Sequence, residues 1–554
     1  MTFHAQLAAW LSLTSLASGL PSPSQTQLLE EGSPVIGVGR LETIQRSLVL
    51  DNGTWFAQVG TDYPTSTQDG VALRLGFPIL REGDPLPSPS GARVRTFGGW
   101  NVDGGGNLFW EIELTGPGII NGNRQALYWN TRLLARQAGP TGLPEFPGSS
   151  WSAFGARLPG PDGRLWFTAS IDDPAVPNPR SLLATTTLRA DGSASPLEVL
   201  AVTGRELAGV GLVRSVVLQG TSATVNARGT LLWAGKRAGP VETDGFLALG
   251  LDHILVAEGD PAPVDGRRFS SFEGCEVALN DREQYAFTCH LNSSPLSPEE
   301  IASNYLLVKD GAKFVQEGDS LPALGAPLDN QPETPLLLSN SGDLYWAARL
   351  RNTPMGLDGA YMRNHDVLIR KGQTYIGGQL VVELDRSIDA FAISPSGRFF
   401  LGKVELRDTG NALVMVDHGA TIPIPGCGAG AAVLDVVGGS AVAGSSLRMA
   451  MDDAQSIGAH TLFCVTKDAR LDSRGCGLRT PQGELFLSSP IVALQAGPLW
   501  ILGPTLFDVP IPAELGLVDS VWHGQGFFLA PPNAPMGTAA WKPTNGLRIE
   551  VGAP

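Results

Sequence analysis

The chain has 554 residues, of which 68 are glycine and 42 are proline, and only 17% are charged. Such a composition excludes coiled coils and helical bundles, whereas 43% hydrophobic residues suffice for a large core and argue against disorder. The formal net charge of -15 disfavours binding to nucleic acid and to anionic membrane surfaces. We therefore expect an all-β protein with many short strands joined by many turns.

The N-terminal segment 1–20 is predicted to be a signal peptide. Its apolar core, AQLAAWLSLTSLASGL, ends in small residues, although no Lys or Arg precedes the core. An N-terminal strand or a docked helix is the alternative. Export predicts an extracellular or cell-envelope location. We expect no membrane insertion, because three prolines interrupt the other long uncharged run, 485–507.

A unit with an aromatic second strand recurs along the chain. Segment 270–319 predicts four strands in a meander, which is the composition of one propeller blade. Its second strand recurs with the turn residue before it at positions 53, 106, 163, 229, 283, 342 and 397. Adjacent aromatic residues in most copies place one ring on each face of the strand, as packing between two neighbours requires. The recurrence predicts seven units.

The fourth strand also recurs, and it ends in a glycine turn. The copies are ILREGDPLP, LLARQAG, VLAVTG, ILVAEGDPAP, FVQEGDSLP and a weaker one near Tyr375 to Gly378. A seventh copy, TQLLEEGSP, lies at residues 26–34, whereas the last unit stops after its third strand at Gly419. The N-terminal strand is therefore predicted to complete the last unit, which closes the ring and removes both sheet edges.

The predicted fold is all-β: a seven-bladed β-propeller over residues 26–420, closed by the N-terminal strand and followed by a small β-sandwich over residues 425–554. The C-terminal region consists of short apolar strands separated by Pro, Asn and Gly. An eighth blade is the alternative, but this region contains neither the aromatic pair nor the EGD turn.

The EGDPLP turn and the C-terminal pieces GCG, PIPAELGLV, GQGFFLAP and NGLRIEVG together resemble secreted bacterial β-propeller repeat proteins that are largely uncharacterised. The resemblance covers the repeats at 26–420 and the ending at 425–554. It implies this architecture and export, and it implies no particular reaction.

Three aspartates are candidate metal ligands. Asp84, Asp260 and Asp319 follow Glu-Gly in equivalent turns. Carboxylates on loops suit a hard cation, so these residues could bind calcium. The alternative is that each Asp accepts backbone N–H bonds within its own turn. No cofactor is otherwise predicted.

The five cysteines suggest two disulfides. Cys275 and Cys289 flank the NDRE turn, and a three-residue loop centred on position 282 would place them opposite each other across a hairpin. Two buried thiols are the alternative. Cys427 and Cys476, in PGCG and RGCG, are the predicted pair of the C-terminal region, which leaves Cys464 as a buried odd thiol. The sequence does not fix this connectivity.

The turns after the fourth strands and the connections between strands two and three are predicted to share one end of the meanders. The longer connections are 116–124, 172–180, 292–303 and 351–365. Loops on a rigid scaffold are where binding residues usually lie. Segment 351–365 contains the candidate ligand-binding residues Arg351, Asp358, Tyr361, Arg363 and His365, which could hydrogen-bond to and stack on a sugar or a peptide. An ordinary solvated loop is the alternative.

No HExxH, GxSxG, Walker or complete GxGxxG motif occurs in the chain. We therefore expect a secreted, non-catalytic propeller that binds or scaffolds a protein or glycan ligand. The competing hypothesis is an extracellular hydrolase or lyase, because propeller enzymes assemble their sites from single residues on different blades. A third hypothesis is that the ring is structural and the C-terminal region mediates attachment.

Overall fold

The computed structural model describes residues 24–552, apart from 36, 66–67, 190–193, 218–221, 273, 293–302, 330–334, 425–431, 440, 454–458, 472–476, 481–482, 489, 500–504, 515–516, 518–519 and 530–540. The predicted signal peptide at 1–20 lies outside these residues. Within the described ranges no helix is both long enough and apolar enough to cross a membrane.

The chain divides into two compact units. We call Thr26–Pro395 with Phe400–Met415 the N-terminal unit, and Ser396–Phe399 with Val416–Pro554 the C-terminal unit. The protein is all-β, as its composition predicts: the described regular structure consists of β-strands with short 3-10 helices such as η2 (Asn121–Asn123) and η3 (Pro161–Gly163).

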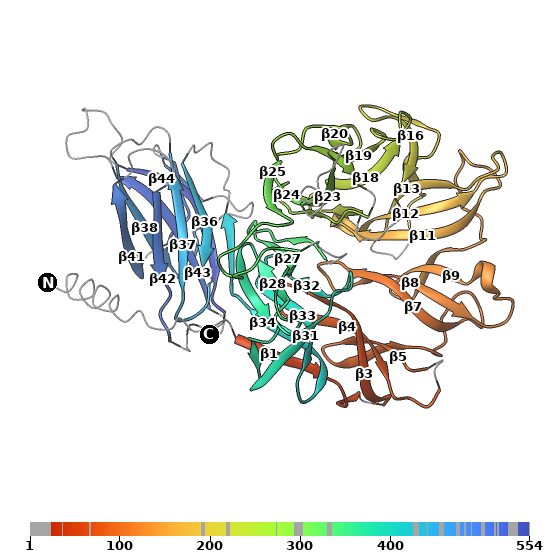
Figure 1. Ribbon diagram of the computed structural model, residues 1–554, viewed down its shortest axis with the longest axis horizontal. Coiled ribbons are helices and arrows are strands. Elements are labelled where there is room, and N and C mark those ends of the chain that lie inside the picture. The colour runs from red at the N-terminus through yellow and green to blue at the C-terminus, as the bar shows by residue number, and fades with distance from the viewer. Residues whose placement is uncertain are drawn as a thin grey trace. The chain divides into compact units, whose positions relative to one another are not determined.

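Seven sheets of the N-terminal part follow one another in chain order (Figure 1). The first contains β2 (Pro34–Val35), β3 (Gly39–Val49), β4 (Trp55–Thr61), β5 (Gly70–Arg74) and β6 (Phe77–Arg81). The second contains β7 (Arg93–Val102), β8 (Leu108–Thr115), β9 (Gln125–Trp129) and β10 (Arg132–Arg136). The third contains β11 (Ser150–Pro159), β12 (Arg164–Asp172), β13 (Arg180–Thr187) and β14 (Glu198–Val202). The fourth contains β15 (Glu206–Leu207), β16 (Gly211–Val216), β17 (Ala223–Val225), β18 (Leu231–Arg237), β19 (Gly245–Leu249) and β20 (His253–Ala257).

The remaining three sheets repeat this order. The fifth contains β21 (Arg268–Ser271), β22 (Val277–Leu279), β23 (Tyr285–Asn292), β24 (Tyr305–Lys309) and β25 (Ala312–Gln316). The sixth contains β26 (Leu337–Leu338), β27 (Leu344–Arg349), β28 (Gly359–Arg363) and β29 (Asp366–Arg370). The seventh contains β30 (Tyr375–Ile376), β31 (Gln379–Leu384), β32 (Phe391–Ile393), β33 (Phe399–Leu406), β34 (Gly410–Asp417) and the N-terminal strand β1 (Ser24–Glu30). In every sheet we number the main strands one to four, so that β7 to β10 are strands one to four of the second sheet.

The N-terminal strand occupies the place of a fourth strand in the seventh sheet. β1 lies at the edge next to β34, and the Glu31 N–H donates to the Asn411 carbonyl at 2.8 Å. This is the predicted pairing between the first and last repeats. It covers an edge of β34 that would otherwise expose unpaired backbone groups.

The aromatic pairs of the second strands pack on opposite faces, as predicted from the alternation of side chains along a strand. Trp110 belongs to one core cluster with Phe56, whereas its neighbour Phe109 belongs to a different cluster with Phe167. Phe167 in turn has its neighbour, Trp166, in a third cluster. The second strands β8 and β12 therefore each contribute to two cores.

The turn that follows strand four has the same hydrogen bonds in all seven sheets. The N–H of its first residue donates to a carbonyl near the start of strand three at 2.8 to 3.1 Å, and the N–H of its second residue donates to a carbonyl at the start of the next sheet. The second residue has φ between 58° and 91°, which favours glycine. The first residues are Glu31, Glu82, Gln137, Thr203, Glu258, Glu317 and Lys371.

One copy of this turn differs from the prediction. The sixth turn is formed by Lys371 and Gly372 after β29, not by the segment from Tyr375 to Gly378. The segment KGQ has no acidic residue, so the EGD pattern does not detect it, although Gly372 has the required φ of 72°.

Each sheet also hydrogen-bonds to the next, and the seventh bonds to the first. The donors and acceptors, in chain order of the sheets, are Trp100 Nε1 to Gln58 Oε1, Asn101 Nδ2 to the Arg157 carbonyl, Val216 N to Ser181 Oγ, Asn226 Nδ2 to the Asn280 carbonyl, Asn280 Nδ2 to the Ser339 carbonyl, Asn340 N to the Pro395 carbonyl, and Lys403 Nζ to the Gln45 carbonyl. The sheets thus form a cyclic series of contacts.

The C-terminal unit has two larger sheets that share one apolar core. One sheet has the order β35 (Ala420–Ile424), β44 (Trp541–Glu550), β43 (Val521–Leu529), β38 (His460–Thr466) and β41 (Ala493–Leu499). The other has the order β36 (Val433–Gly439), β37 (Ser446–Asp452) and β42 (Thr505–Pro510), and a separate hairpin pairs β39 (Leu478–Thr480) with β40 (Gly483–Leu485). The shared core includes Met449 of β37, Phe463 of β38 and Leu547 of β44.

Candidate functional site

One end of the sheets of the N-terminal unit brings together the strand-four turns and the connections between strands two and three. In the third sheet Nη1 of Arg180, at the start of β13, donates to the Thr203 carbonyl of the strand-four turn at 2.8 Å. In the connections around the fifth and sixth sheets, Nη2 of Arg351 lies 2.6 Å from Oε1 of Glu317. These contacts agree with the predicted common face, which we call the turn face.

Within the EGD turns of this face, the glutamates are buried and the aspartates are not. Oε2 of Glu258 accepts the Gly245 N–H at 2.9 Å, and Oε2 of Glu82 accepts the Gly70 N–H at 3.2 Å. Burial raises the pKa of both carboxyl groups. Glu82 and Glu258 each lie over a glycine that opens strand three, and in these two sheets the co-occurrence of Glu and Gly is the sequence signal that could have revealed the contact.

The aspartates of these turns accept hydrogen bonds from their own backbone. Oδ2 of Asp84, Asp260 and Asp319 accepts the N–H three residues earlier, at 2.8, 2.8 and 2.9 Å. The three residues lie after strands of three different sheets, and the described residues contain no group of three or more His, Cys, Asp or Glu side chains that could hold a metal ion. Calcium binding at these residues stays a prediction for three separate turns.

Two of the candidate ligand-binding residues, Arg351 and Asp358, lie in the connection between β27 and β28 on the turn face. The Arg351 guanidinium is paired with Glu317 and with Asp329. The Asp358 carboxylate lies 2.9 Å from Lys371 Nζ and 2.9 Å from Arg386 Nη2. Both residues therefore already have internal partners of opposite charge.

The other three candidates do not lie in that connection, because strand three begins at Gly359. Tyr361 is buried within β28, and its hydroxyl lies within hydrogen-bond distance of two main-chain carbonyls, those of Lys403 at 2.7 Å and Asp385 at 2.9 Å. Arg363 ends β28 and lies 2.6 Å from Asp343, so that, against the effect of burial, it lowers the pKa of Asp343 to about 2. His365 stacks on Phe314 at 4.6 Å in the turn between β28 and β29. The predicted loop is thus divided between the two ends of a strand, and its five residues form no single site.

Cys275 and Cys289 are free, buried thiols, so the predicted disulfide is absent. The predicted hairpin register is right where β22 exists, since Val277 pairs with Phe287 and Leu279 with Tyr285. The regular ladder ends there, however, and the Cys275 N–H closes a turn on the Phe272 carbonyl at 3.3 Å. The Cys289 thiol donates instead to a carbonyl of the neighbouring strand β24 at 3.7 Å.

The cysteines of the C-terminal unit are only partly described. Cys427 and Cys476 lie outside the described residues, so their predicted pairing stays a prediction. Cys464 is buried and free, as predicted, and burial raises the pKa of its thiol to about 11.

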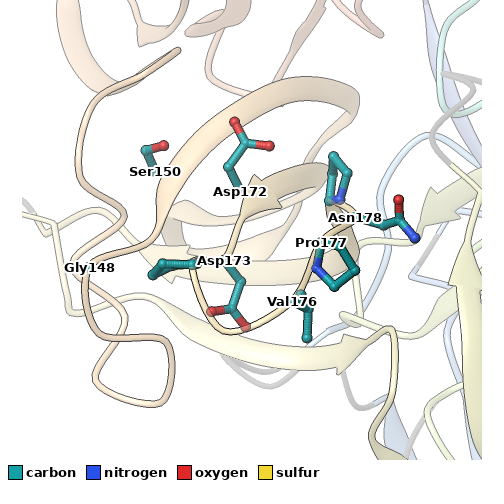
Figure 2. A pocket seen from close by; sticks show the side chains of 9 residues that line it. Gly148, Ser150, Asp172, Asp173, Val176, Pro177 and Asn178 are labelled. Carbon is teal, nitrogen blue, oxygen red and sulfur yellow. The ribbon is translucent and has the colours of Figure 1, made fainter.

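A pocket of about 300 Å3 opens on the turn face at the end of the third sheet (Figure 2). It is lined by the connection between β12 and β13 and by the residues that lead into β11: Gly148, Ser150, Asp172, Asp173, Pro174, Val176, Pro177, Asn178 and Pro179. This connection coincides with the predicted loop 172–180. In Figure 2 the carboxylates of Asp172 and Asp173 point in opposite directions.

Asp173 and Arg180 hold the pocket loop in place. The buried Asp173 carboxylate accepts the Ala175 N–H at 2.9 Å and Arg180 Nε at 2.8 Å, and these two hydrogen bonds lower its pKa. The same guanidinium lies over the Phe146 ring at 5.6 Å. Three prolines further restrict the loop backbone. The loop is therefore preorganised before any ligand arrives.

Three polar groups that line the pocket have no internal partner. Ser150 and Asp172 are paired across β11 and β12, yet within the described structure neither side chain makes a hydrogen bond or an ion pair, and neither does that of Asn178. A carboxylate, a hydroxyl and an amide together can accept and donate hydrogen bonds to hydroxyl, amide or ammonium groups. The sequence predicts the loop 172–180 on the common face but marks none of these three residues. In particular, nothing in the sequence separates the free Asp172 from the paired Asp173.

Comparisons with known proteins establish no family. No family model matches the chain, and no curated protein matches it. Among solved structures the chain is similar to Trypanosoma rangeli sialidase in complex with sialic acid, at 10% identity over 96% of this chain and 92% of that one, with a TM-score of 0.26. It is also similar to another sialidase (10% identity, 96% and 52% of the chains, TM-score 0.18) and to Morganella morganii TcdA4 (10%, 90% and 22%, 0.16). Similarity at this level assigns no residue roles.

Proposed function

We propose that the chain is an exported, non-catalytic binding or scaffold protein for a protein or glycan ligand. In this proposal the N-terminal unit is a seven-bladed β-propeller closed by β1, and the C-terminal unit is a small β-sandwich. The ligand binds in the pocket at the end of the third sheet. The single observation that carries the functional part is a preformed pocket whose polar groups are left unpaired by the rest of the chain.

The cyclic contacts support the propeller. Seven equivalent turns each link one sheet to the next, and the bond from Lys403 to the Gln45 carbonyl, at 2.7 Å, joins the last sheet to the first. A closed ring of this kind removes sheet edges and presents loops from a rigid frame. The common core of the two larger C-terminal sheets supports the sandwich.

The local chemistry supports binding. The side chains of Asp172 and Asn178 are exposed and make no hydrogen bond within the described structure, whereas the adjacent Asp173 is paired with Arg180. A loop already fixed by Asp173, Arg180 and prolines loses little conformational entropy when it binds a ligand. The free groups match the hydroxyls of a sugar or the amide and ammonium groups of a peptide.

The test is a screen of the mature protein against glycans and peptides, followed by calorimetry of each hit. Asp172→Asn and Asn178→Ala should weaken binding by about tenfold or more, because each removes a hydrogen bond, one of them to a charged group. Asp162→Asn is the matched control, since Asp162 is exposed at the opposite end of the same sheet. Equal binding by Asp172→Asn and wild type would refute the pocket as the site, and turnover of the bound ligand would refute a non-catalytic role.

A further inference from the structure

Arg267 lies in the connection between two sheets, at a position where two equivalent connections have a small buried residue. In the connection from β20 to β21 the Ala262 N–H donates to the Arg267 carbonyl, and the corresponding bond in the connection from β6 to β7 runs from Leu86 N to the Ala92 carbonyl. The connection from β10 to β11 places Ser149 there by the same bond. Ala92 is 1% exposed and Ser149 is 3% exposed, so the fold does not require a long cationic side chain at this place.

The Arg267 guanidinium is buried without a partner. The residue is only 8% exposed, and its Nε and Nη2 atoms are buried with no acceptor. Nη1 has no hydrogen-bond partner either, and unlike Nε and Nη2 it is not fully buried, so it is the nitrogen that faces the surface. The next residue differs: Arg268 donates through Nη1 to the Gly259 carbonyl at 2.5 Å, as Arg93 donates to Gly83 in the first such connection.

An unpaired buried guanidinium is costly, because an arginine cannot lose its charge at neutral pH and each buried N–H lacks an acceptor. The nitrogen that is not fully buried, Nη1, can donate a charge-assisted hydrogen bond to an oxygen of a carboxylate, sulfate or phosphate group. We propose that Arg267 is the centre of an anion-binding site for an oxyanion of this kind, presented by a ligand on the turn face. Arg267 does not line the pocket at the third sheet, so the two sites can be tested independently.

The experiment uses the full chain and measures thermal stability and calorimetric binding with sodium sulfate, sodium phosphate and sodium acetate, each against sodium chloride at equal ionic strength. Sulfate and phosphate probe a tetrahedral oxyanion, and acetate probes a carboxylate. At least one of these salts should raise the melting temperature of the wild type relative to chloride. Arg267→Met should weaken the binding of that anion by about tenfold or more, because a hydrogen bond between charged groups is lost.

Arg228→Met is the matched control, because Arg228 is an exposed arginine at the opposite end of the fourth sheet. It removes the same charge and should leave anion binding unchanged. An equal loss in both variants would mean general screening of positive charge and would overturn the proposal.

Stability in chloride provides a second readout. The methionine chain replaces the buried stem of Arg267 without its charge, so Arg267→Met should be at least as stable as the wild type when no oxyanion is present. A variant that unfolds or melts well below the wild type in chloride would show that the guanidinium is a structural group, and this too would overturn an anion site.

Discussion

A methyl group added to Gly245 tests how the turn glutamates hold the sheets. A Cβ at this position would lie 2.5 Å from Cδ and 2.9 Å from Oε2 of Glu258, which is closer than real Cβ atoms approach other atoms. The carboxylate accepts the Gly245 N–H at 2.9 Å and a further backbone hydrogen bond from Phe272, and the residue is only 6% exposed. Gly245→Ala must therefore expel Glu258 or shift strand β19.

The cost follows from the bonds that are lost. A hydrogen bond to a charged group contributes about 1.5 to 3 kcal/mol, and a backbone donor that stays buried without an acceptor costs about 1 to 3 kcal/mol. Because the carboxylate can partly relax toward solvent, we expect Gly245→Ala to lower the free energy of unfolding of this sheet by about 2 to 4 kcal/mol.

Hydrogen exchange of the amides in β18 to β20, together with urea unfolding, measures the effect. The control is Gly239→Ala, because a Cβ on Gly239 meets nothing within 4 Å and the change should cost less than about 0.5 kcal/mol. In a Glu258→Ala background the cost of Gly245→Ala should fall to a similar level, since the obstructing carboxylate is gone. If Gly245→Ala costs no more than the control, or costs the same in both backgrounds, the packing argument is wrong.

Four other outcomes are expected. Burial raises the pKa of Glu258, so the folded state keeps that proton to higher pH than the unfolded state; Glu258→Gln should therefore gain stability relative to wild type as pH rises from about 4 to 7 in urea titrations, and a constant difference would contradict this. Burial raises the pKa of Cys275 to about 12, and that of Cys289 also lies well above its ordinary value, so neither thiol should react with iodoacetamide at neutral pH until the protein is unfolded; a linked peptide in a non-reducing map would disprove free thiols. Asn280→Ala removes four hydrogen bonds of a buried amide, including one to the Ser339 carbonyl, and should cost about 2 to 4 kcal/mol with faster exchange in the fifth and sixth sheets. Deleting residues 24–32 uncovers the edge of β34 and should cause aggregation detectable by light scattering, whereas a stable monomer would argue against the role of β1.

The repeated elements could be predicted because their signals are local. Alternating apolar residues, adjacent aromatic rings and glycine at a positive φ depend on a few neighbouring residues, so the second strands and most of the strand-four turns were found where the structure has them. The EGD pattern does not detect the turn at Lys371, because this turn has the glycine but no acidic residue.

The candidate site could be predicted only as a region. The sequence predicts the loop 172–180 as a connection on the turn face, and residues of this loop line the pocket. The five candidate residues in 351–365 do not form one site, because a strand starts at Gly359 and no residue type in DGAYMR marks that boundary clearly. Strand β28 lies between them, so Arg351 and His365 are at opposite ends of that strand.

The sequence by itself determined the all-β class, the recurring unit and the position of most of its turns, because hydrophobic alternation and turn chemistry act over a few residues. Only the tertiary structure decided which charged groups are already paired. Arg351 meets Glu317 and Arg363 meets Asp343 through contacts between different strands and turns, whereas Asp172 is left free and Arg267 is buried without an acceptor. Ion pairing depends on distances in space between residues far apart in the chain, and those distances set which side chains remain available to a ligand.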